Sequence, residues 1–234
     1  MMKSTEEYRD SLRSYNPRVF IDGRQIENVA DEPLLQPGIN GIGITYDYAS
    51  KPEFAPLMLA REQETGKMVN RLLHIDRTTD DLLAKLEAIR ILCCEAGCVQ
   101  RYLVHDAFNG LYQATKRCDA EEGTSYFERF RDFMIEVQDK DLSYGIAMTD
   151  AKGDRSKKPH QQQHIDSYLH IVEERPDGIV ISGTKAIVTS APYMHGFIVM
   201  PCRAMTPDDT AFAVCCAVPV DAEGITILAR PAGR

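Results

Sequence analysis

A polar loop and a strand end in the second half of the chain carry side chains suited to bind a charged ligand. Residues 149–159 read TDAKGDRSKKP, and their hydrogen-bond donors include Thr149, Arg155, Ser156, Lys157 and Lys158. The segment 183–192, GTKAIVTSAP, runs from a predicted strand into small hydroxyl residues and a proline. A loop and a strand end of this kind can hold a large planar cofactor with a charged tail.

A second segment carries groups for acid–base chemistry. His105 lies between Tyr102 and Asp106, and a histidine with an orienting carboxylate can act as a general base. Neighbouring residues on a helix point about 100° apart, so Asp106 is expected to cap a helix or to pair elsewhere. His105 is then either a histidine that faces a substrate or an ordinary structural histidine.

The cysteines and histidines are not spaced like a known metal site. Cys94 and Cys98 have the spacing to share one helix face, but they supply only two ligands. The later cysteines fall in predicted apolar strands, where a thiol behaves as a small buried hydrophobe; they are Cys202, Cys215 and Cys216. We therefore predict buried structural thiols and no metal ligands.

The composition is that of an acidic globular protein. The chain has 234 residues, of which 44% are hydrophobic and 26% charged, enough to bury a core. The net charge of −8 argues against a nucleic-acid or anionic-membrane partner. No apolar run approaches the roughly 18 residues of a membrane span, and no secretory signal is recognisable. Seven cysteines without a small-scaffold spacing favour a reducing, cytoplasmic compartment.

These residues must be positioned by elements whose pattern changes near residue 144. Before it we expect helices at about 4–15, from 78 toward 116, and at 125–137, with a hairpin at 18–26 and a loop at 31–51. After it come about five short strands at 168–172, 178–182, 197–200, 212–218 and 225–228, typical of a small barrel or sandwich. The predicted fold class is α+β, with a mainly helical domain at 1–143 and a small β-barrel domain at 144–234. The last strand is expected either to form a sheet edge or to precede a further segment.

The chain resembles the 4-hydroxyphenylacetate 3-monooxygenase / 4-hydroxybutyryl-CoA dehydratase flavoprotein superfamily over almost its whole length. The resemblance rests on YNPRV at 15–19, TTDDL at 78–82, QR at 100–101, DAFN at 106–109, TD at 149–150, GDRS at 153–156, VEERPDGIV at 172–180 and MP at 200–201. It implies an acyl-CoA-dehydrogenase-like fold, in which a helical domain precedes a small β-barrel domain and a C-terminal helical bundle. Family members are about twice as long, so we expect this chain to lack the bundle.

The resemblance also implies a flavin, FAD or FADH2, bound between the barrel and the helices. The implied flavin contacts are Thr149, Asp150, Arg155, Ser156, Gln161, Gln162, Thr189 and Ser190. Tyr102 and His105 are the candidate catalytic residues. The implied activity is hydroxylation of a small phenolic substrate, with a flavin reductase as partner, in a homotetramer. The alternatives are a 4-hydroxybutyryl-CoA dehydratase / vinylacetyl-CoA isomerase-like enzyme acting on an acyl-CoA, and a truncated non-catalytic paralogue.

Neither active site of the superfamily is reproduced in full. The dehydratases carry a [4Fe-4S] cluster bound by two helix cysteines with three residues between them. Here Cys98 matches the first cysteine and Tyr102 replaces the second, so we expect no conventional cluster. The hydroxylases carry an arginine, a tyrosine and a histidine for the phenol, and Leu103, Ala107 and Ile146 fall at those places.

Overall fold

A computed structural model describes residues 2–98, 100–151 and 153–230. Lys152 of the polar loop and the last four residues of the chain lie outside this range. Within it, every helix is too short or too polar to cross a membrane.

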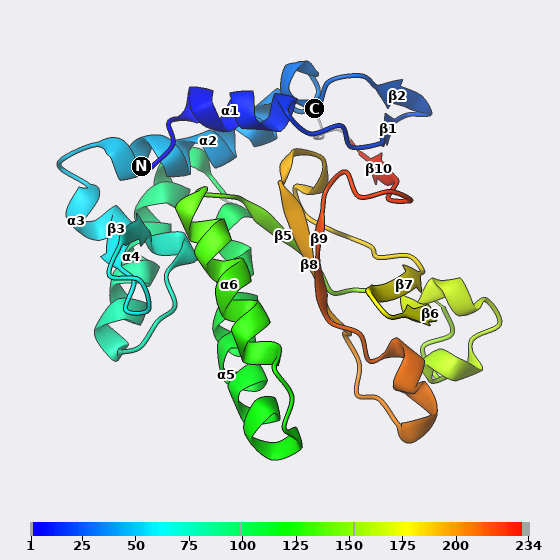
Figure 1. The fold of residues 1–234 in the computed structure, drawn as a ribbon. Coiled ribbons are helices and arrows are strands. Elements are labelled where there is room, and N and C mark those ends of the chain that lie inside the picture. The colour runs from blue at the N-terminus through cyan, green and yellow to red at the C-terminus, as the bar shows by residue number, and fades with distance from the viewer. Residues whose placement is uncertain (1, 99, 152, 231–234) are drawn as a thin grey trace.

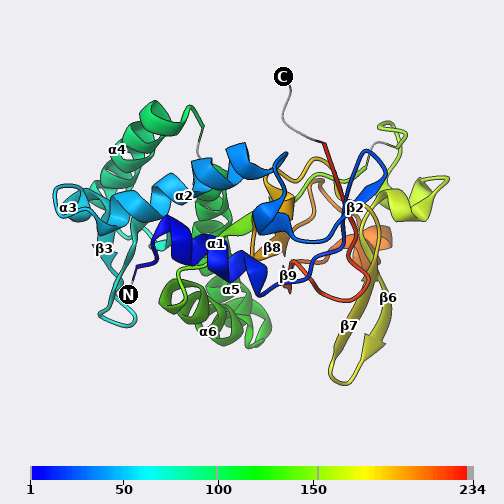
Figure 2. The ribbon, with the colours of Figure 1, turned by 90° about the horizontal axis from the view of Figure 1, so that it is seen from above.

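Helices and strands are largely segregated along the chain. The helices are α1 (Thr5–Arg13), α2 (Gln36–Ser50), α3 (Ala55–Met58), α4 (Thr79–Ala96), α5 (Val104–Glu122) and α6 (Tyr126–Asp139). The strands are β1 (Val19–Ile21), β2 (Arg24–Ile26), β3 (Leu59–Arg61), β4 (Met68–Asn70), β5 (Tyr144–Ala147), β6 (His170–Arg175), β7 (Gly178–Ser182), β8 (Gly196–Val199), β9 (Cys216–Pro219) and β10 (Ile227–Ala229). Figure 1 shows α3–α6 on one side, β5–β9 on the other, and α1 and α2 across the top; Figure 2 looks down onto α1 and α2.

Local capping and turn signals predicted several of these elements correctly. α1 begins with a capping box in which Ser4 and Glu7 each bond the other's backbone. α4 begins with the same arrangement between Thr78 and Asp81. The hairpin of β1 and β2 turns at Asp22 and Gly23, both with positive φ. Each of these features depends on residues close together in sequence.

The predicted loop at 31–51 is wrong, because most of it forms α2. Pro37 lies in the first turn of this helix, where its missing N–H costs nothing. The glycines that suggested a loop instead allow close packing: a Cβ on Gly38 would lie 2.1 Å from the hydroxyl oxygen of Tyr193. A Cβ on Gly43 would lie 2.6 Å from the methyl carbon of Thr5 in α1.

The helix predicted from 78 toward 116 is two helices. α4 ends at Ala96, and the Gly97 that follows has φ +77°, which ends a helix readily. The short 3-10 helix η3 (Gln100–Leu103) then leads into α5. α5 and α6 pack as a long antiparallel pair, seen in green in Figure 1.

The strands of the described residues form four small sheets and no closed barrel. Their orders are β10-β1-β2, β3-β4, β5-β8-β9 and β6-β7. β5 runs parallel to β8, and β10 returns to pair in parallel with β1 near the start of the chain. The strand predicted at 212–218 begins only at Cys216, because 207–212 form the 3-10 helix η7 (Pro207–Phe212). The mixed α and β composition was correct, but the predicted barrel was not found.

The largest core cluster joins both ends of the chain. Tyr8, Ile39 and Tyr46 of the first two helices pack in it with Met194 and Phe197, all at most 5% exposed. The Tyr8 hydroxyl also donates a hydrogen bond to the Tyr193 carbonyl, at 2.7 Å. The β-rich part is therefore held against α1 and α2, which fixes the position of the loops that follow β5 and β7.

Candidate functional site

The structure brings together the two segments on which the flavin prediction depends. The Ala186 N–H donates to the Thr149 carbonyl at 2.8 Å, and the Ala151 N–H donates to the Thr184 carbonyl at 3.0 Å. The Lys185 ammonium lies 2.6 Å from an Asp150 carboxylate oxygen, and both side chains are buried. The loop after β5 and the segment after β7 therefore form one continuous surface.

Asp150 holds this junction together. Its carboxylate accepts hydrogen bonds from the Leu169 N–H at 3.1 Å and from the Cys202 thiol at 3.4 Å, in addition to the Lys185 ammonium. Lys185 also donates to the carbonyls of Met148 and Met200, each at 2.9 Å. A buried carboxylate with these partners fixes three chain segments and has little capacity left for a ligand.

Three of the other predicted flavin residues form bonds within the loop. The Ser156 hydroxyl donates to Asp154 at 2.6 Å, and the Gln161 amide oxygen accepts from the Lys158 N–H at 3.1 Å. Gln162 accepts from the Asp154 N–H at 2.9 Å and donates to the Asp154 carbonyl at 2.8 Å. These hydrogen bonds fix the shape of the loop, although Ser156 and Gln161 are themselves exposed.

The remaining predicted flavin residues face outward. The side chains of Thr149, Arg155 and Thr189 are exposed, and Ser190 is half-buried with a left-handed φ of +63°. Ile187 beside them is 89% exposed, so the surface combines hydroxyls, a guanidinium and an apolar side chain. The strand predicted through this segment is limited to a single bridge at Lys185, and Thr189 lies in a turn.

Gly183 is required at the start of this segment. Its φ is +137°, and an added Cβ would lie 2.4 Å from the Leu169 Cα and 2.6 Å from the Tyr168 carbonyl oxygen. Gly183→Ala should therefore lower the free energy of unfolding by about 2–4 kcal/mol, because backbone must move and the conformation is strained. Gly178→Ala is the control, since no atom lies within 4 Å of its Cβ. Urea unfolding of the two variants checks this, and equal losses would contradict it.

The candidate catalytic pair Tyr102 and His105 lies apart from these loops in sequence, at the junction of η3 and α5. The His105 Nδ1 contacts the Tyr102 carbonyl at 2.5 Å, and its Nε2 lies 3.1 Å from an Asp106 carboxylate oxygen. The expectation that Asp106 pairs elsewhere was wrong, because in the first turn of α5 its side chain folds back onto the ring. Burial, followed by the nearby Cys98 and Cys93, raises the pKa of Tyr102.

The cysteines differ from their prediction in position and burial. Cys94 lies within α4 but Cys98 follows its terminal glycine, so the two do not share a helix face. Cys202 and Cys215 are exposed and Cys216 is half-buried, because Cys202 and Cys215 lie outside strands. In the part of the chain that the structure describes, no three His, Cys, Asp or Glu side chains are grouped to hold a metal ion.

The charged residues of the helical core were not identified from the sequence. Arg101 and Asp141, 0% and 1% exposed, form a buried ion pair, and the Arg101 guanidinium lies 3.9 Å from the Tyr46 ring centre. Lys85, also fully buried, lies 2.9 Å from Asp76. Their sequence positions look like ordinary surface charges, and no local signal marks them as buried.

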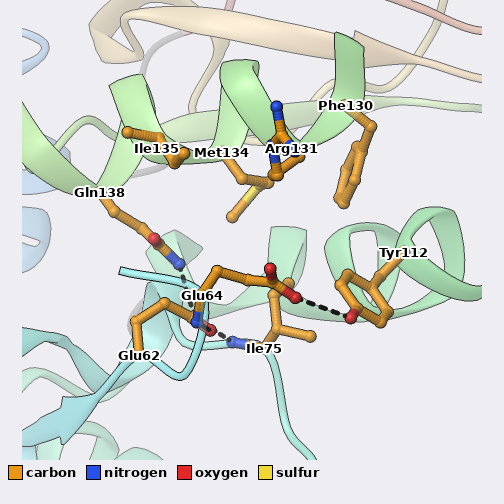
Figure 3. A pocket seen from close by; sticks show the side chains of 9 residues that line it. All are labelled: Glu62, Glu64, Ile75, Tyr112, Phe130, Arg131, Met134, Ile135 and Gln138. Atoms are coloured by element: carbon orange, nitrogen blue, oxygen red, sulfur yellow. Dashed lines mark hydrogen bonds between the residues drawn. The ribbon is translucent and has the colours of Figure 1, made fainter. Parts of the chain in front are cut away.

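A small cavity between α5, α6 and the turn after β3 is shown in Figure 3. Its polar groups bond one another: Tyr112 donates to Glu64 at 3.0 Å, and Gln138 donates to Glu62 at 3.0 Å. The buried Glu62 also accepts from the Ile75 N–H at 3.4 Å. None of the predicted flavin or catalytic residues lines this cavity, which is a packed junction of the helical part.

Comparison with known proteins identifies the family to which the chain belongs. The family described as 4-hydroxyphenylacetate 3-hydroxylase N terminal matches residues 4–234. A 4-hydroxybutyryl-CoA dehydratase/vinylacetyl-CoA-Delta-isomerase of Clostridium aminobutyricum is 40% identical over 97% of this chain and 47% of its own length. The chain thus spans about half the length of that curated relative.

Two solved structures share the fold. An archaeal 4-hydroxybutyryl-CoA dehydratase from N. maritimus, described as oxygen tolerant, superposes with a TM-score of 0.94 and 37% identity, over 97% of this chain and 45% of its own. The oxygenase component of 4-hydroxyphenylacetate 3-monooxygenase complexed with FAD superposes with a TM-score of 0.83 over 98% of this chain and 47% of its own. Its 19% identity shows a common fold alone. The chain belongs to the 4-hydroxyphenylacetate 3-hydroxylase family.

Proposed function

We propose that this protein functions as a flavin-dependent hydroxyacyl-CoA dehydratase that acts on 4-hydroxybutyryl-CoA or a close analogue. The observation that carries the proposal is the 40% identity to a 4-hydroxybutyryl-CoA dehydratase over 97% of the chain. A 4-hydroxyphenylacetate 3-monooxygenase oxygenase component of Geobacillus is less similar, at 27% identity over 98% of the chain. This reverses the order of the two activities inferred from the sequence, where phenol hydroxylation came first.

A product assay separates the two activities. The full gene product, purified without oxygen and supplied with FAD, is incubated with 4-hydroxybutyryl-CoA, and mass spectrometry follows the thioester. We expect the thioester to lose one water. In parallel, 4-hydroxyphenylacetate is supplied with reduced FAD and oxygen. Gain of one oxygen atom by the phenol, with no loss of water from the thioester, would contradict the proposal and support the monooxygenase.

FAD is the proposed cofactor, and the outward-facing groups fit it chemically. The exposed Thr149 and Thr189 hydroxyls can bond the polar edge of a flavin ring, and the exposed Arg155 guanidinium can pair with its pyrophosphate. When bound, FAD supplies the electron-transfer chemistry of its ring. We propose direct contacts from these three residues and Ser190.

The other four predicted flavin residues are proposed to act through the loop. Asp150 joins the loop to Lys185, and the side chains of Ser156, Gln161 and Gln162 bond neighbouring backbone or Asp154. Their replacement would move the donors that face outward. With the four native side chains in place, the loop presents its exposed donors to the cofactor in a fixed arrangement.

Tyr102 and His105 stay the proposed substrate-contacting residues. Both ring nitrogens of His105 have partners, but Asp106 is 85% exposed, so a substrate group can replace its carboxylate at Nε2. A histidine in this setting can hold or move a proton at Nε2 while Nδ1 stays bonded to the Tyr102 carbonyl.

We also propose that residues 1–143 and 144–234 act as the helical and flavin-binding parts of an acyl-CoA-dehydrogenase-like enzyme. A symmetric homo-oligomer is supported by three leucines of α4, Leu82, Leu83 and Leu86, which are 44–56% exposed. A flavin reductase partner belongs to the monooxygenase alternative. The cytoplasmic location stays a prediction.

Thr189→Val should weaken FAD binding by about 1–3 kcal/mol, because valine keeps the shape but leaves a flavin polar group without its partner. Fluorescence titration with FAD measures the change. Thr65→Val in the turn between β3 and β4 is the matched control and should bind FAD as the unmodified protein does. Unchanged affinity in the Thr189 variant would mean that the flavin lies on another face.

A further inference from the structure

Arg203 holds the polar loop through its backbone carbonyls. Its Nη2 donates to the Arg155 carbonyl at 3.0 Å, and its Nη1 donates to the Lys157 carbonyl at 3.0 Å. Nη1 also lies 2.9 Å from the hydroxyl of Tyr168, which is 6% exposed. The planar guanidinium thus binds two carbonyls of one loop at once, each through a different nitrogen of its rigid fork.

Gln162 supports the same stretch of backbone. Its amide donates to the carbonyls of Asp154 and Lys157, at 2.8 and 3.3 Å. The Lys157 carbonyl therefore accepts from both Gln162 and Arg203. Gly153 makes this approach feasible, since a Cβ there would lie 2.2 Å from the Gln162 amide oxygen.

A second contact ties the loop to the segment that carries Arg203. The His160 Nδ1 lies 2.7 Å from a carboxylate oxygen of Asp209, which is fully buried. Asp209 is itself fixed by the N–H and hydroxyl of Thr206, at 2.9 and 2.7 Å. The segment 203–209 is therefore a scaffold with its own internal bonds, against which the loop packs.

The carbonyls of the loop are turned toward Arg203 while the side chains of Arg155, Ser156 and Lys157 are exposed. We propose that Arg203 is a positioning residue for flavin binding, which presents the Arg155 side chain to the cofactor by fixing the backbone on both sides of Ser156. This inference rests on the proposed flavin site. Nothing in the sequence pattern marks Arg203, which lies 48 positions from Arg155.

Two measurements on Arg203→Ala in the full gene product test the inference. The first is the FAD dissociation constant, which should rise about tenfold or more because the loop must be ordered on binding. The second is the rate of trypsin cleavage after Arg155 and Lys157 without FAD, which should rise by a similar factor as the loop opens more often. Arg203→Lys, whose single ammonium nitrogen replaces the two donor nitrogens of the planar guanidinium, should give values between those of Arg203→Ala and the unmodified protein in both measurements.

Arg117→Ala is the matched control, because Arg117 is 78% exposed on α5 and pairs with Glu121, one turn further along the same helix. Thermal unfolding shows that each variant is folded before the comparison. Faster cleavage with unchanged FAD affinity would overturn the inference and leave Arg203 a purely structural residue, as would no change in either measurement. Failure of the unmodified protein to bind FAD would instead refute the proposed function, while the cleavage rates still report on the loop.

Discussion

Asp141→Asn is expected to lower the free energy of unfolding by about 3–5 kcal/mol, because it leaves Arg101 buried and unpaired. Arg101 is 0% exposed, and its other hydrogen bonds go to neutral groups, the Thr45 hydroxyl and the Leu142 carbonyl, each at 3.3 Å. Burial lowers the pKa of Arg101, but the Asp141 carboxylate, together with Tyr46 and Tyr8, more than offsets it, so the pKa is raised. The charge of Asp141 is therefore what keeps this guanidinium inside the protein.

Asparagine is chosen because Asp141 has φ +46°, a conformation that asparagine tolerates. Chemical denaturation of the variant and the unmodified protein gives the difference. The control is Asp132→Asn, whose carboxylate is 65% exposed and pairs with Arg131, so a change below about 1 kcal/mol is expected. If Asp141→Asn lowered the free energy of unfolding by no more than Asp132→Asn does, the pair of Arg101 and Asp141 would not be what holds the helical part to the start of β5.

Acid should destabilise the protein through His195, which is 1% exposed between α1 and β8. The Ser143 N–H donates to its Nδ1 at 2.9 Å, so Nδ1 carries no proton. Its Nε2–H then donates to the Ser11 hydroxyl at 2.8 Å, which donates to the Tyr8 carbonyl at 2.6 Å. Burial, followed by the charges of Lys3 and Arg101, lowers the pKa of His195 to about 3.

The sign of the effect follows from the lowered pKa. The stabilising contribution of neutral His195 is complete above the unfolded-state pKa of about 6.5. Between pH 6.5 and the folded-state pKa of about 3, His195 is protonated in the unfolded chain but stays neutral in the folded protein. The free energy of unfolding should therefore fall by about 1.4 kcal/mol per pH unit from this residue alone.

Urea unfolding between about pH 7 and 4.5 measures this slope. Carboxylates add their own pH dependence, so the comparison is with His195→Gln, whose amide can accept from Ser143 and donate to Ser11. As the pH falls, the free energy of unfolding of the variant should decrease less steeply than that of the unmodified protein. The difference in slope should correspond to one proton fewer taken up on unfolding. Identical slopes would show that His195 is not held neutral by the fold.

Those parts of the fold that depend on local sequence were predictable. Two helix starts were predicted from capping residues, Ser4 with Glu7 and Thr78 with Asp81. The hairpin was predicted from the turn residues Asp22 and Gly23. α2 was missed because its glycines serve tertiary packing against Tyr193 and Thr5, which a local pattern cannot show. The barrel was overpredicted because strand spacing does not reveal which strands pair, and β10 pairs with β1 across more than 200 positions.

The candidate site was predictable as two segments but not as a set of roles. The segments around Thr149 and Thr189 are adjacent through Asp150 and Lys185, as a shared cofactor surface requires. Which side chains bond the loop itself was not predictable, because Gln162 and Ser156 have the same chemistry as residues that contact a ligand. Arg203 was missed because two of its partners are backbone carbonyls, which any residue type can supply, and the third, Tyr168, is 35 positions away.

The central claim, a flavin enzyme of this family, is tested most directly by the absorbance spectrum of the full gene product after incubation with FAD and gel filtration. We expect a yellow protein that retains a flavin band at about one FAD per chain, with a midpoint of thermal unfolding raised by bound FAD. A colourless protein whose unfolding midpoint is the same with and without FAD would contradict the claim.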